Sequence, residues 1–305
     1  MHTKLSLKKS NLWLRAKVLQ AIRQFFIEHD YLEVETPNII PAPAPEAHIE
    51  AITAGDGFLH TSPELCMKRL LSAGHNKIFQ ICKCYREGER GDLHLPEFTM
   101  LEWYRTGIDY LDLMAECEAM IRFITSKINA GKKIRYRGNL IDLEKTWERI
   151  TVKKAFESYT PVTMKEALET EQFNELMATE IEPRLPGDRP VFLYGYPADL
   201  ASLSRIKKHD PEVAERFELY IGGLELANAF TELTDPGEQK DRFGRESTLR
   251  KSLGKKVYPS PDKFLKDLGH MPPASGIALG LDRLVLLYSG DTKIDNVVSF
   301  TPEEL

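Results

Sequence analysis

The chain has 305 residues and a formal net charge of -5 at pH 7, with 41 lysine and arginine residues against 46 aspartate and glutamate residues. This balance excludes the large basic excess that is typical of dedicated nucleic-acid-binding proteins. The sequence also lacks the ~18 continuous apolar residues of a membrane span and the apolar run of a signal peptide. We therefore expect a cytoplasmic protein that does not enter a membrane and has enough residues for a substantial core.

The first predicted helix has Ser10 as its N-cap and runs to about residue 29, because apolar residues recur along it with helical spacing. A short extended segment, residues 31–37, follows this helix and ends at a proline. Residues 38–56 are rich in proline and alanine, so we expect them to form a loop.

A predicted strand over residues 58–61 leads into a well-formed helix start at Ser62, Pro63 and Glu64. Serine suits the N-cap, proline suits the first helical position, and an acid is favourable in the first turn. We therefore expect a helix to begin here.

Residues 79–104 read as two strands joined by a charged, glycine-containing loop. Side chains alternate across a strand, so one face of the first strand carries Gln80, Cys82, Cys84 and Arg86, and one face of the second carries Phe98, Met100, Glu102 and Tyr104. The opposite face of the second strand, with Leu101 and Trp103, suits the core. A carboxylate among apolar neighbours is costly to bury unless it is paired. Arg86, Phe98 and Glu102 therefore predict a site in which the arginine binds an anion, the phenyl ring binds a flat base and the acid binds a cation.

The rest of the chain alternates helical and extended segments. Helices are predicted over 110–129, 150–183 and 235–256, and strands over 134–142, 191–196 and, around Gly222 and Gly223, 217–232. Residues 276–287 read as a glycine-bearing strand followed by a helix. Because hairpins outnumber βαβ units, we expect an α+β fold in which helices flank an antiparallel sheet, within one domain over residues 1–305.

The four cysteines, Cys66, Cys82, Cys84 and Cys117, lack the paired spacing of a metal site. Cys82 and Cys84 share a strand face, so they could bind a metal only with partners from another part of the chain. Reduced, partly buried thiols are the favoured interpretation.

Arg86 is the candidate anion ligand. A lone arginine on a strand usually forms an ordinary ion pair, here with Glu87 or Glu89. This arginine instead leads into a loop that contains Gly88, Gly91 and His94. With Phe98 beyond the loop, the arrangement favours a phosphate held by the guanidinium group beside a stacked nucleobase.

Glu218 and Glu225 flank the turn at Gly222 and Gly223. They are either exposed acids or, if the turn folds back, a carboxylate pair that holds a divalent cation, as magnesium is held together with substrate phosphates. Asn228 and Glu232 lie on one strand face. Because Asn228 is three residues from Glu225, the strand must contain a bulge if both are to reach the same site.

Gly276 and Gly280 are four residues apart and form a poor dinucleotide-binding fingerprint, since no further glycine opens the helix. Arg283, early in that helix, either extends its charged end to solvent or clamps a phosphate or base.

Together these segments resemble the sequence motifs of class II aminoacyl-tRNA synthetases, in their lysine branch. Residues 31–37 resemble motif 1, residues 79–104 resemble motif 2 and residues 276–287 resemble motif 3. Residues 217–235 are also similar to the lysyl enzymes, and the resemblance extends from about Asn11 to Phe300. It implies the class II catalytic fold and a homodimer formed through motif 1.

The resemblance also implies roles for residues. Arg86 and Arg283 would be catalytic, and ATP would be bound by both arginines and by Glu87, Gly88, His94, Leu95, Phe98, Glu225, Leu226 and Gly280. Glu218 and Glu225 would bind Mg²⁺. The amino acid would contact Ser62, Pro63, Glu64, Glu102, Tyr104, Asn228, Glu232 and Ala278. Two acids and a phenol suit an amino acid that carries two positive charges, such as lysine.

Two features separate the chain from a lysyl-tRNA synthetase. About thirty residues precede motif 1, which leaves no room for an anticodon-binding domain, and Ala278 stands where the synthetase has glycine. An added methyl group in a pocket is worth about 1–3 kcal/mol of discrimination. Both features are similar to the freestanding paralogue family that modifies elongation factor P. That family activates lysine, preferably (R)-β-lysine, and attaches it to a lysine side chain of the factor, so elongation factor P is the implied partner and tRNA is not.

The chain departs from the family pattern at three places. Arg-Asn-Glu is replaced by residues 86–88, Arg-Glu-Gly, where Glu89 is a candidate substitute for the missing acid. His-Asn-Pro is replaced by residues 94–96, His-Leu-Pro, and Asn-Gly-Phe by residues 228–230, Asn-Ala-Phe. Three alternatives remain, namely a truncated synthetase that charges tRNA, an asparagine-synthetase-like ligase, and a non-catalytic paralogue that binds ATP and lysine.

Overall fold

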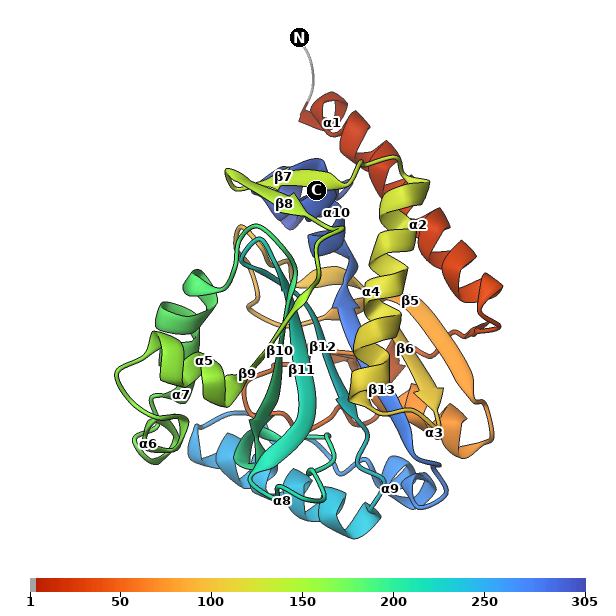
Figure 1. Cartoon of the computed structure of the whole chain (residues 1–305). Helices are drawn as coiled ribbons and strands as arrows, with labels where there is room; N and C mark the ends of the chain where they lie inside the picture. The colour runs from red at the N-terminus through yellow and green to blue at the C-terminus, as the bar shows by residue number, and fades with distance from the viewer. Residues whose placement is uncertain (1–3) are drawn as a thin grey trace.

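A computed structural model describes residues 4–305, and its central feature is an eight-stranded sheet (Figure 1). The strand order is β1 (Leu32–Glu33), β5 (Lys77–Tyr85), β6 (Glu97–Thr106), β13 (Ala274–Gly280), β12 (Leu224–Thr231), β11 (Val213–Ile221), β10 (Val191–Pro197) and β9 (Glu148–Thr151). Strands β5 to β10 pair antiparallel, whereas β1 and β9 pair parallel at the two edges. The sheet is therefore mixed rather than wholly antiparallel, because long helical connections join each edge strand to its neighbour.

Ten α-helices surround this sheet in residues 4–305. They are α1 (Lys4–Leu7), α2 (Lys9–Glu28), α3 (Glu64–Ser72), α4 (Tyr110–Lys127), α5 (Val152–Tyr159), α6 (Met164–Glu169), α7 (Phe173–Leu176), α8 (Pro236–Ser252), α9 (Asp262–Leu268) and α10 (Leu281–Ser289). Helices α2, α4 and α10 pack on one face, where Leu101 and Trp103 of β6 enter the largest hydrophobic core (Figure 1). The core face predicted for the second strand of the hairpin is thus confirmed.

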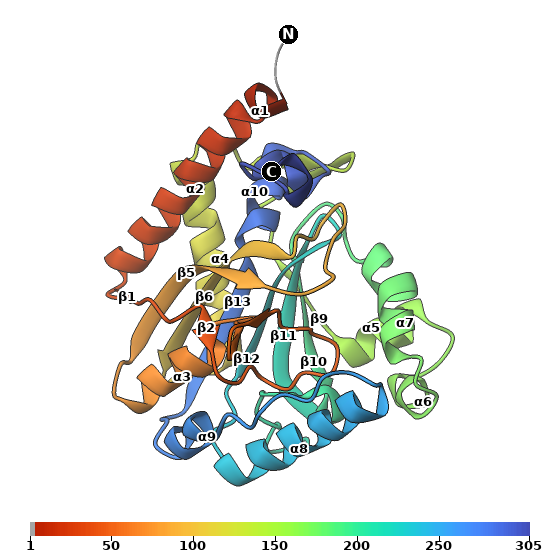
Figure 2. The ribbon, with the colours of Figure 1, turned by 180° about the vertical axis from the view of Figure 1, so that it is seen from behind.

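The opposite face of the sheet is crossed by the segment that precedes α3 (Figure 2). This segment holds a small sheet of β2 (Ile39–Ile40), β3 (Thr53–Ala54) and β4 (Gly57–Leu59), so the loop predicted over residues 38–56 contains two short strands. Helix α8 anchors the segment from outside, because Arg250 is fully buried and donates to the carbonyls of Glu46, Ile49 and Lys256. A buried guanidinium is tolerated when its N–H groups find acceptors. Helix α8 is therefore partly buried, although most of its residues are polar.

Two other local predictions need correction. Ser10 lies inside α2 rather than at its N-cap, which is Lys8, because α1 precedes that helix directly. Residues 134–142 form a hairpin of β7 (Lys133–Tyr136) and β8 (Asn139–Asp142), not a single strand. Arg137 and Gly138 have φ angles of 47° and 82°, the pair of left-handed conformations that a two-residue hairpin turn requires.

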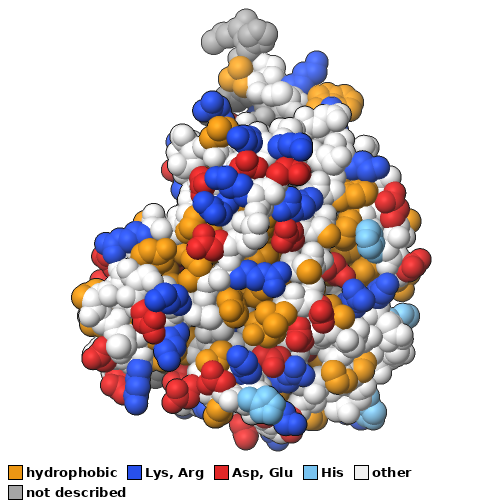
Figure 3. Space-filling model, in the orientation of Figure 1, with side chains coloured by type: hydrophobic (Ala, Val, Ile, Leu, Met, Phe, Trp, Pro, Cys, Tyr) orange, Lys and Arg blue, Asp and Glu red, His pale blue; other side chains and the backbone are white. Residues whose placement is uncertain are grey.

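The surface shown in Figure 3 carries basic and acidic side chains side by side, in line with the near balance of charge in the sequence. None of the helices in residues 4–305 combines the length and apolar character needed to cross a membrane.

Candidate active site

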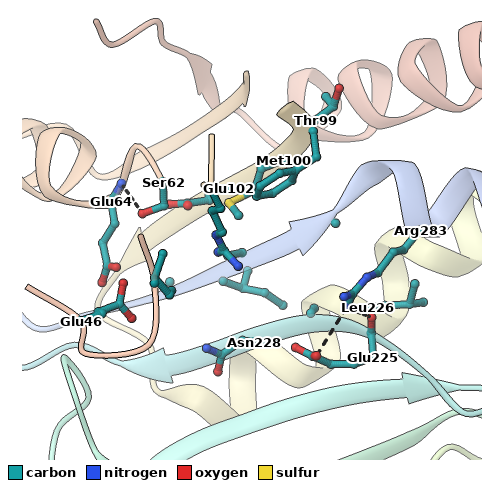
Figure 4. Close-up of a pocket in the computed structure, with 18 of the residues that line it drawn as sticks. Glu46, Ser62, Glu64, Thr99, Met100, Glu102, Glu225, Leu226, Asn228 and Arg283 are labelled. Carbon is teal, nitrogen blue, oxygen red and sulfur yellow. Dashed lines mark hydrogen bonds and ion pairs between the residues drawn. The ribbon is translucent and has the colours of Figure 1, made fainter. Parts of the chain in front are cut away.

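A cavity of about 380 Å³ opens on the sheet face opposite α4, between β6, β12, β13 and the segment before α3 (Figure 4). Its wall contains Ser62, Glu64, Arg86, His94, Leu95, Phe98, Glu102, Tyr104, Glu225, Leu226, Asn228, Ala278, Gly280 and Arg283. All of these residues were predicted to belong to the site, and the first and last of them, Ser62 and Arg283, are 221 positions apart in the chain. The pairing of Gln80 with Glu102 and of Cys82 with Met100 places the polar faces of β5 and β6 together on the cavity side, as the alternation of residues predicts.

The other predicted site residues lie outside this wall. Pro63, and not Ser62 as predicted, is the N-cap of α3, because the helix begins one residue later, at Glu64. The Ser62 hydroxyl accepts a 3.4 Å hydrogen bond from the amide of Glu64. Glu87 and Gly88 are exposed in the loop between β5 and β6. Gly88 has a φ of 78°, a left-handed conformation that favours glycine, and the next residue, Glu89, supplies a carboxylate to the cavity wall.

Arg86 lies at the end of the cavity nearest that loop. Its guanidinium carbon is 5.1 Å from the ring centroid of Phe98, and its Nη1 atom is 3.7 Å from the Glu89 carboxylate. Its Nε atom is buried and has no hydrogen-bond partner among residues 4–305. A buried N–H without an acceptor is costly, so this side chain is ready to bind an anionic oxygen.

Arg283 points inward rather than to solvent. It donates to the backbone carbonyl of Glu225 at 2.9 Å and lies 3.4 Å from the Glu225 carboxylate (Figure 4). It also lies 2.5 Å from Nε2 of His94. Burial, followed by the charge of Arg283, lowers the pKa of His94, so the imidazole is neutral at pH 7 and its Nε2 accepts this hydrogen bond.

A β-bulge brings Glu225 to the cavity. Tyr220 pairs with Glu225 and Leu219 pairs with Ala227, so Leu226 is an extra residue in β12. The bulge that was predicted from the three-residue spacing between Glu225 and Asn228 is confirmed, and both residues line the cavity.

Glu218 lies behind Glu225. It accepts hydrogen bonds from Arg216 and from the hydroxyl groups of Tyr196 and Tyr220. Burial, and then the charge of Glu218, raise the pKa of Glu225 to about 7. Glu225 lines the cavity and Glu218 does not, but a divalent cation at Glu225 would relieve the repulsion between the two carboxylates. The prediction of a magnesium site at Glu218 and Glu225 is thus chemically reasonable and stays a prediction.

The raised pKa of Glu225 has a consequence for stability. Because the folded protein holds this proton at a pH where the unfolded chain has released it, the unfavourable contribution of Glu225 grows as the pH rises from about 4.5 to about 7. We expect Glu225→Gln to stabilise the metal-free protein at pH 8 by about 1 kcal/mol, after allowance for solvent screening of this partly exposed side chain, and to have little effect at pH 4.5. Denaturant unfolding at both pH values measures this, and an equal change at the two values would contradict it.

The opposite end of the cavity is acidic. Glu46, Glu64 and Glu102 line it, and Glu232 lies directly behind Gly276, while Lys68 is the buried cation that balances part of this charge. The ammonium group of Lys68 is 2.5 Å from both Glu64 and Glu232. Burial by itself lowers the pKa of Lys68, but the two carboxylates raise it above its usual value, so the lysine stays charged.

Burial raises the pKa of each of three acids here, that of Glu46 to about 7, that of Glu232 to about 8 and that of Glu102 well above its usual value. The Tyr104 hydroxyl donates to Glu102 at 2.9 Å. However, Oε1 of Glu102 and Oε1 of Glu232 are buried and receive no hydrogen bond from the residues that the structure describes. Four carboxylates lie at this end, whereas the cations near them are Lys68 and Arg216, and Arg216 is paired with Glu218. This end of the cavity therefore suits a guest with ammonium groups.

Glu46 and Lys68 lie at the site but were not predicted from the sequence. Glu46 belongs to a proline-rich segment that was expected to be a loop, and nothing in its local sequence marks it as part of a site. Lys68 lies four residues after Glu64 on α3, so the spacing could have revealed their ion pair.

The comparisons with known proteins agree on one family. The model of a family described as tRNA synthetases class II (D, K and N) matches residues 2–304. The chain belongs to the class II aminoacyl-tRNA synthetase family. The resemblance predicted from its motifs is confirmed, and so is the α+β fold class.

Eight similar relatives carry the name elongation factor P–(R)-β-lysine ligase. The protein from Pseudoalteromonas translucida is 37% identical over 303 residues, which cover 94% of this chain and 93% of the relative. Those from Avibacterium paragallinarum and Photorhabdus laumondii subsp. laumondii are each 38% identical, over 95% and 96% of this chain and over 94% and 95% of the relatives. The chain is thus an enzyme of the ligase type, as predicted.

Ala278, where the synthetases of the lysine branch carry glycine, lies at the centre of the acidic end. On the sheet it pairs with Glu102 on one side and with Asn228 on the other, so its methyl group enters the cavity between them. Position 278 is thus placed where its side chain alters the shape of the acidic end of the cavity.

Gly276 has no space for a side chain. A Cβ atom there would lie 2.2 Å from the ring of Tyr104 and 2.5 Å from Oε1 of Glu232. We expect Gly276→Ala to destabilise the protein by about 1–3 kcal/mol, since the ring and the carboxylate must move. The same movement should impair binding of the amino acid. Gly244→Ala is the control, because a Cβ at Gly244 on α8 meets nothing within 4 Å. Thermal unfolding measures both variants, and equal melting temperatures would contradict the expectation.

Proposed function

We propose that the protein is an ATP-dependent ligase that adenylates lysine or (R)-β-lysine and transfers it to a lysine side chain of elongation factor P. The main support is that one cavity joins an arginine and an aromatic ring at one end to unbalanced carboxylates at the other. The first end suits a nucleotide and the second suits an amino acid with two ammonium groups. The relatives that share about 95% of the chain are named for this reaction.

In the first step, the carboxylate of the amino acid attacks the α-phosphate of ATP in line, and the bond from that phosphorus to the pyrophosphate breaks. The products are an aminoacyl-adenylate and pyrophosphate. Arg86 would stabilise the charge that develops on the α-phosphate oxygens, and Arg283 would act from the other side of the nucleotide. Most of the acceleration would come from holding the two substrates in this geometry.

Mg²⁺ would be bound by Glu225, with Glu218 behind it, and would supply positive charge to the phosphates of ATP. Glu225 is the better placed of the two, since its side chain is 43% exposed and lines the cavity. Glu218 keeps its three protein donors and so would orient the site and add negative charge.

In the second step, the ε-amine of the acceptor lysine attacks the carbonyl carbon of the adenylate. The acyl–phosphate bond breaks, AMP leaves, and the amine loses a proton as the amide forms. No side chain of the enzyme becomes covalently attached. Glu46, which lies at the cavity wall and has a pKa of about 7, is a candidate to accept that proton.

We also propose that the protein forms a homodimer through residues 31–37 and that it is located in the cytoplasm. In the same proposal, tRNA is not a substrate. The exposed fraction of Leu32, 50%, leaves an apolar side chain in motif 1 available for a partner subunit.

Mass spectrometry of elongation factor P tests the proposal. The factor is incubated with the enzyme, ATP, Mg²⁺ and either lysine isomer, and transfer RNA is included in a parallel reaction. We expect one added lysyl group on the factor, attached through an amide that resists hydroxylamine, and no charged tRNA. An unmodified factor in a reaction that charges tRNA would overturn the proposal and favour a truncated synthetase.

A further inference from the structure

Three side chains with soft donor atoms gather beside the cavity but outside its wall. His60 lies between β4 and α3, and Cys82 and Cys84 lie on one face of β5. One donor atom of each residue lies within 4.8 Å of the donors of the other two. The partner from elsewhere that the two cysteines would need for a metal is therefore present, although the sequence did not reveal it.

The spacing of the two sulfur atoms suits a shared metal ion. Cys82 Sγ and Cys84 Sγ are 3.9 Å apart. Two sulfurs bound to one tetrahedral zinc ion at about 2.3 Å each lie about 3.8 Å from one another. The thiols therefore need almost no movement, whereas the imidazole, which has a ring nitrogen within 4.8 Å of both sulfurs, must approach them to bind the same ion.

The histidine has one ring nitrogen available as a metal ligand. Its ring is fully buried, and its Nε2–H donates to the carbonyl oxygen of Lys83 at 2.6 Å. This bond fixes the tautomer that has its proton on Nε2. Nδ1 then carries a lone pair that can bind a metal, and it has no hydrogen-bond partner among residues 4–305. Histidines that bind metals usually donate their other N–H to a carbonyl or carboxylate in this way. A buried nitrogen without a partner is costly, and a bound ion would remove that cost.

Two further side chains, Gln80 and Met100, lie next to the cluster of His60, Cys82 and Cys84. Gln80 stands on the same strand face as Cys82, and its buried Oε1 atom has no partner within residues 4–305. Met100 Sδ lies 4.0 Å from Cys84 Sγ and separates the cluster from the cavity. Cys82 is partly exposed, which gives an ion a path from solvent. One nitrogen and two sulfurs, with a fourth position open to water or an amide oxygen, form a ligand set that zinc accepts.

We propose that His60, Cys82 and Cys84 form a Zn²⁺ site. The ion binds Nδ1 of His60 and the two thiolates, and each thiol releases its proton to solvent when it binds. The site joins β5, which Arg86 directly follows, to the segment that carries Ser62 and leads into α3 at Glu64. Zinc would therefore hold two parts of the cavity wall together, a positioning role that is independent of the amino acid that the enzyme uses.

Zinc titration of the reduced, metal-free, full-length protein tests this proposal, with a coloured chelator as competitor. We expect one equivalent per chain, a melting temperature that rises with zinc, and thiolate-to-metal absorption when Co²⁺ replaces Zn²⁺. Cys82→Ser and Cys84→Ser should each weaken binding by at least about tenfold. Cys66→Ser, which changes a partly buried thiol on α3 outside the cluster, should bind zinc as the unaltered protein does.

A second measurement needs no variant, so it does not depend on the folding of an altered protein. Zinc should slow the alkylation of Cys82 and leave the alkylation rate of Cys66 unchanged. Peptide mass spectrometry measures both rates. A chain that takes up no stoichiometric zinc while its thiols are reduced would overturn the proposal. So would equal affinity in Cys84→Ser and the unaltered protein, or equal protection of Cys66 and Cys82.

Discussion

Replacement of Arg86 by methionine is expected to lower the rate of adenylate formation by about 100- to 1,000-fold, because the variant loses the guanidinium group nearest the predicted α-phosphate. Methionine keeps much of the packing against Phe98, and the neutral side chain also removes the unpartnered buried Nε. Lysine-dependent ATP–pyrophosphate exchange measures the rate. Arg86→Lys should recover only part of the loss, since an ammonium group keeps the charge but not the forked hydrogen-bond geometry.

Arg90→Met is the matched control for this variant. Arg90 lies in the same loop, but it pairs with Asp295 and Glu303 at the surface and is not part of the cavity wall. Exchange in Arg90→Met should stay within about twofold of the unaltered enzyme, because surface ion pairs contribute little. Similar losses in the two variants would mean that Arg86 acts only by holding the loop, and its assignment to the phosphate would fail.

Replacement of Glu102 by glutamine is expected to raise the KM for lysine or (R)-β-lysine by about 10- to 100-fold and to leave the KM for ATP nearly unchanged. The side chain stays almost the same size, but the variant loses the charge that would face the ammonium group of the substrate, a contact worth about 1.5–3 kcal/mol. Initial rates of pyrophosphate exchange, with each substrate varied in turn, give the two constants.

The same substitution should stabilise the enzyme without substrate at pH 8. Burial raises the pKa of Glu102 well above its usual value, so the folded state disfavours the charge that glutamine removes. Glu97→Gln on the exposed end of the same strand is the control, and it should change neither the KM values nor stability appreciably. A Glu102 variant with raised KM values for both substrates and lowered stability would indicate a structural role instead.

The parts of the site that were predicted correctly depend on local rules. Alternation along the second strand was enough to place Phe98 and Glu102 on one face, with Arg86 at the mouth of the loop. The three-residue spacing from Glu225 to Asn228 required the bulge that β12 contains. The fold could be predicted because motifs in a fixed order point to one family. The pairing direction of the two edge strands could not be predicted from the number of hairpins. The parallel pairing of β1 and β9 depends on long connections whose course no local pattern records.

The parts that were missed depend on contacts between distant segments. Glu46 reaches the cavity because Arg250, about two hundred residues later, holds the backbone of the surrounding segment through its carbonyls. A buried arginine in a helix as polar as α8 has no sequence signature, since its burial is decided by acceptors elsewhere in the chain. The approach of His60 to Cys82 and Cys84 is hidden for the same reason.

The most direct test of the central claim is ATP–pyrophosphate exchange with a matched series of amino acids at saturating ATP. If one pocket accepts the nucleotide and a guest with two ammonium groups, (R)-β-lysine or lysine should stimulate exchange at least 100-fold more than norleucine, which has a similar length but no second charge. Equal stimulation by norleucine, or none by either lysine isomer in a folded enzyme that binds ATP, would contradict the account.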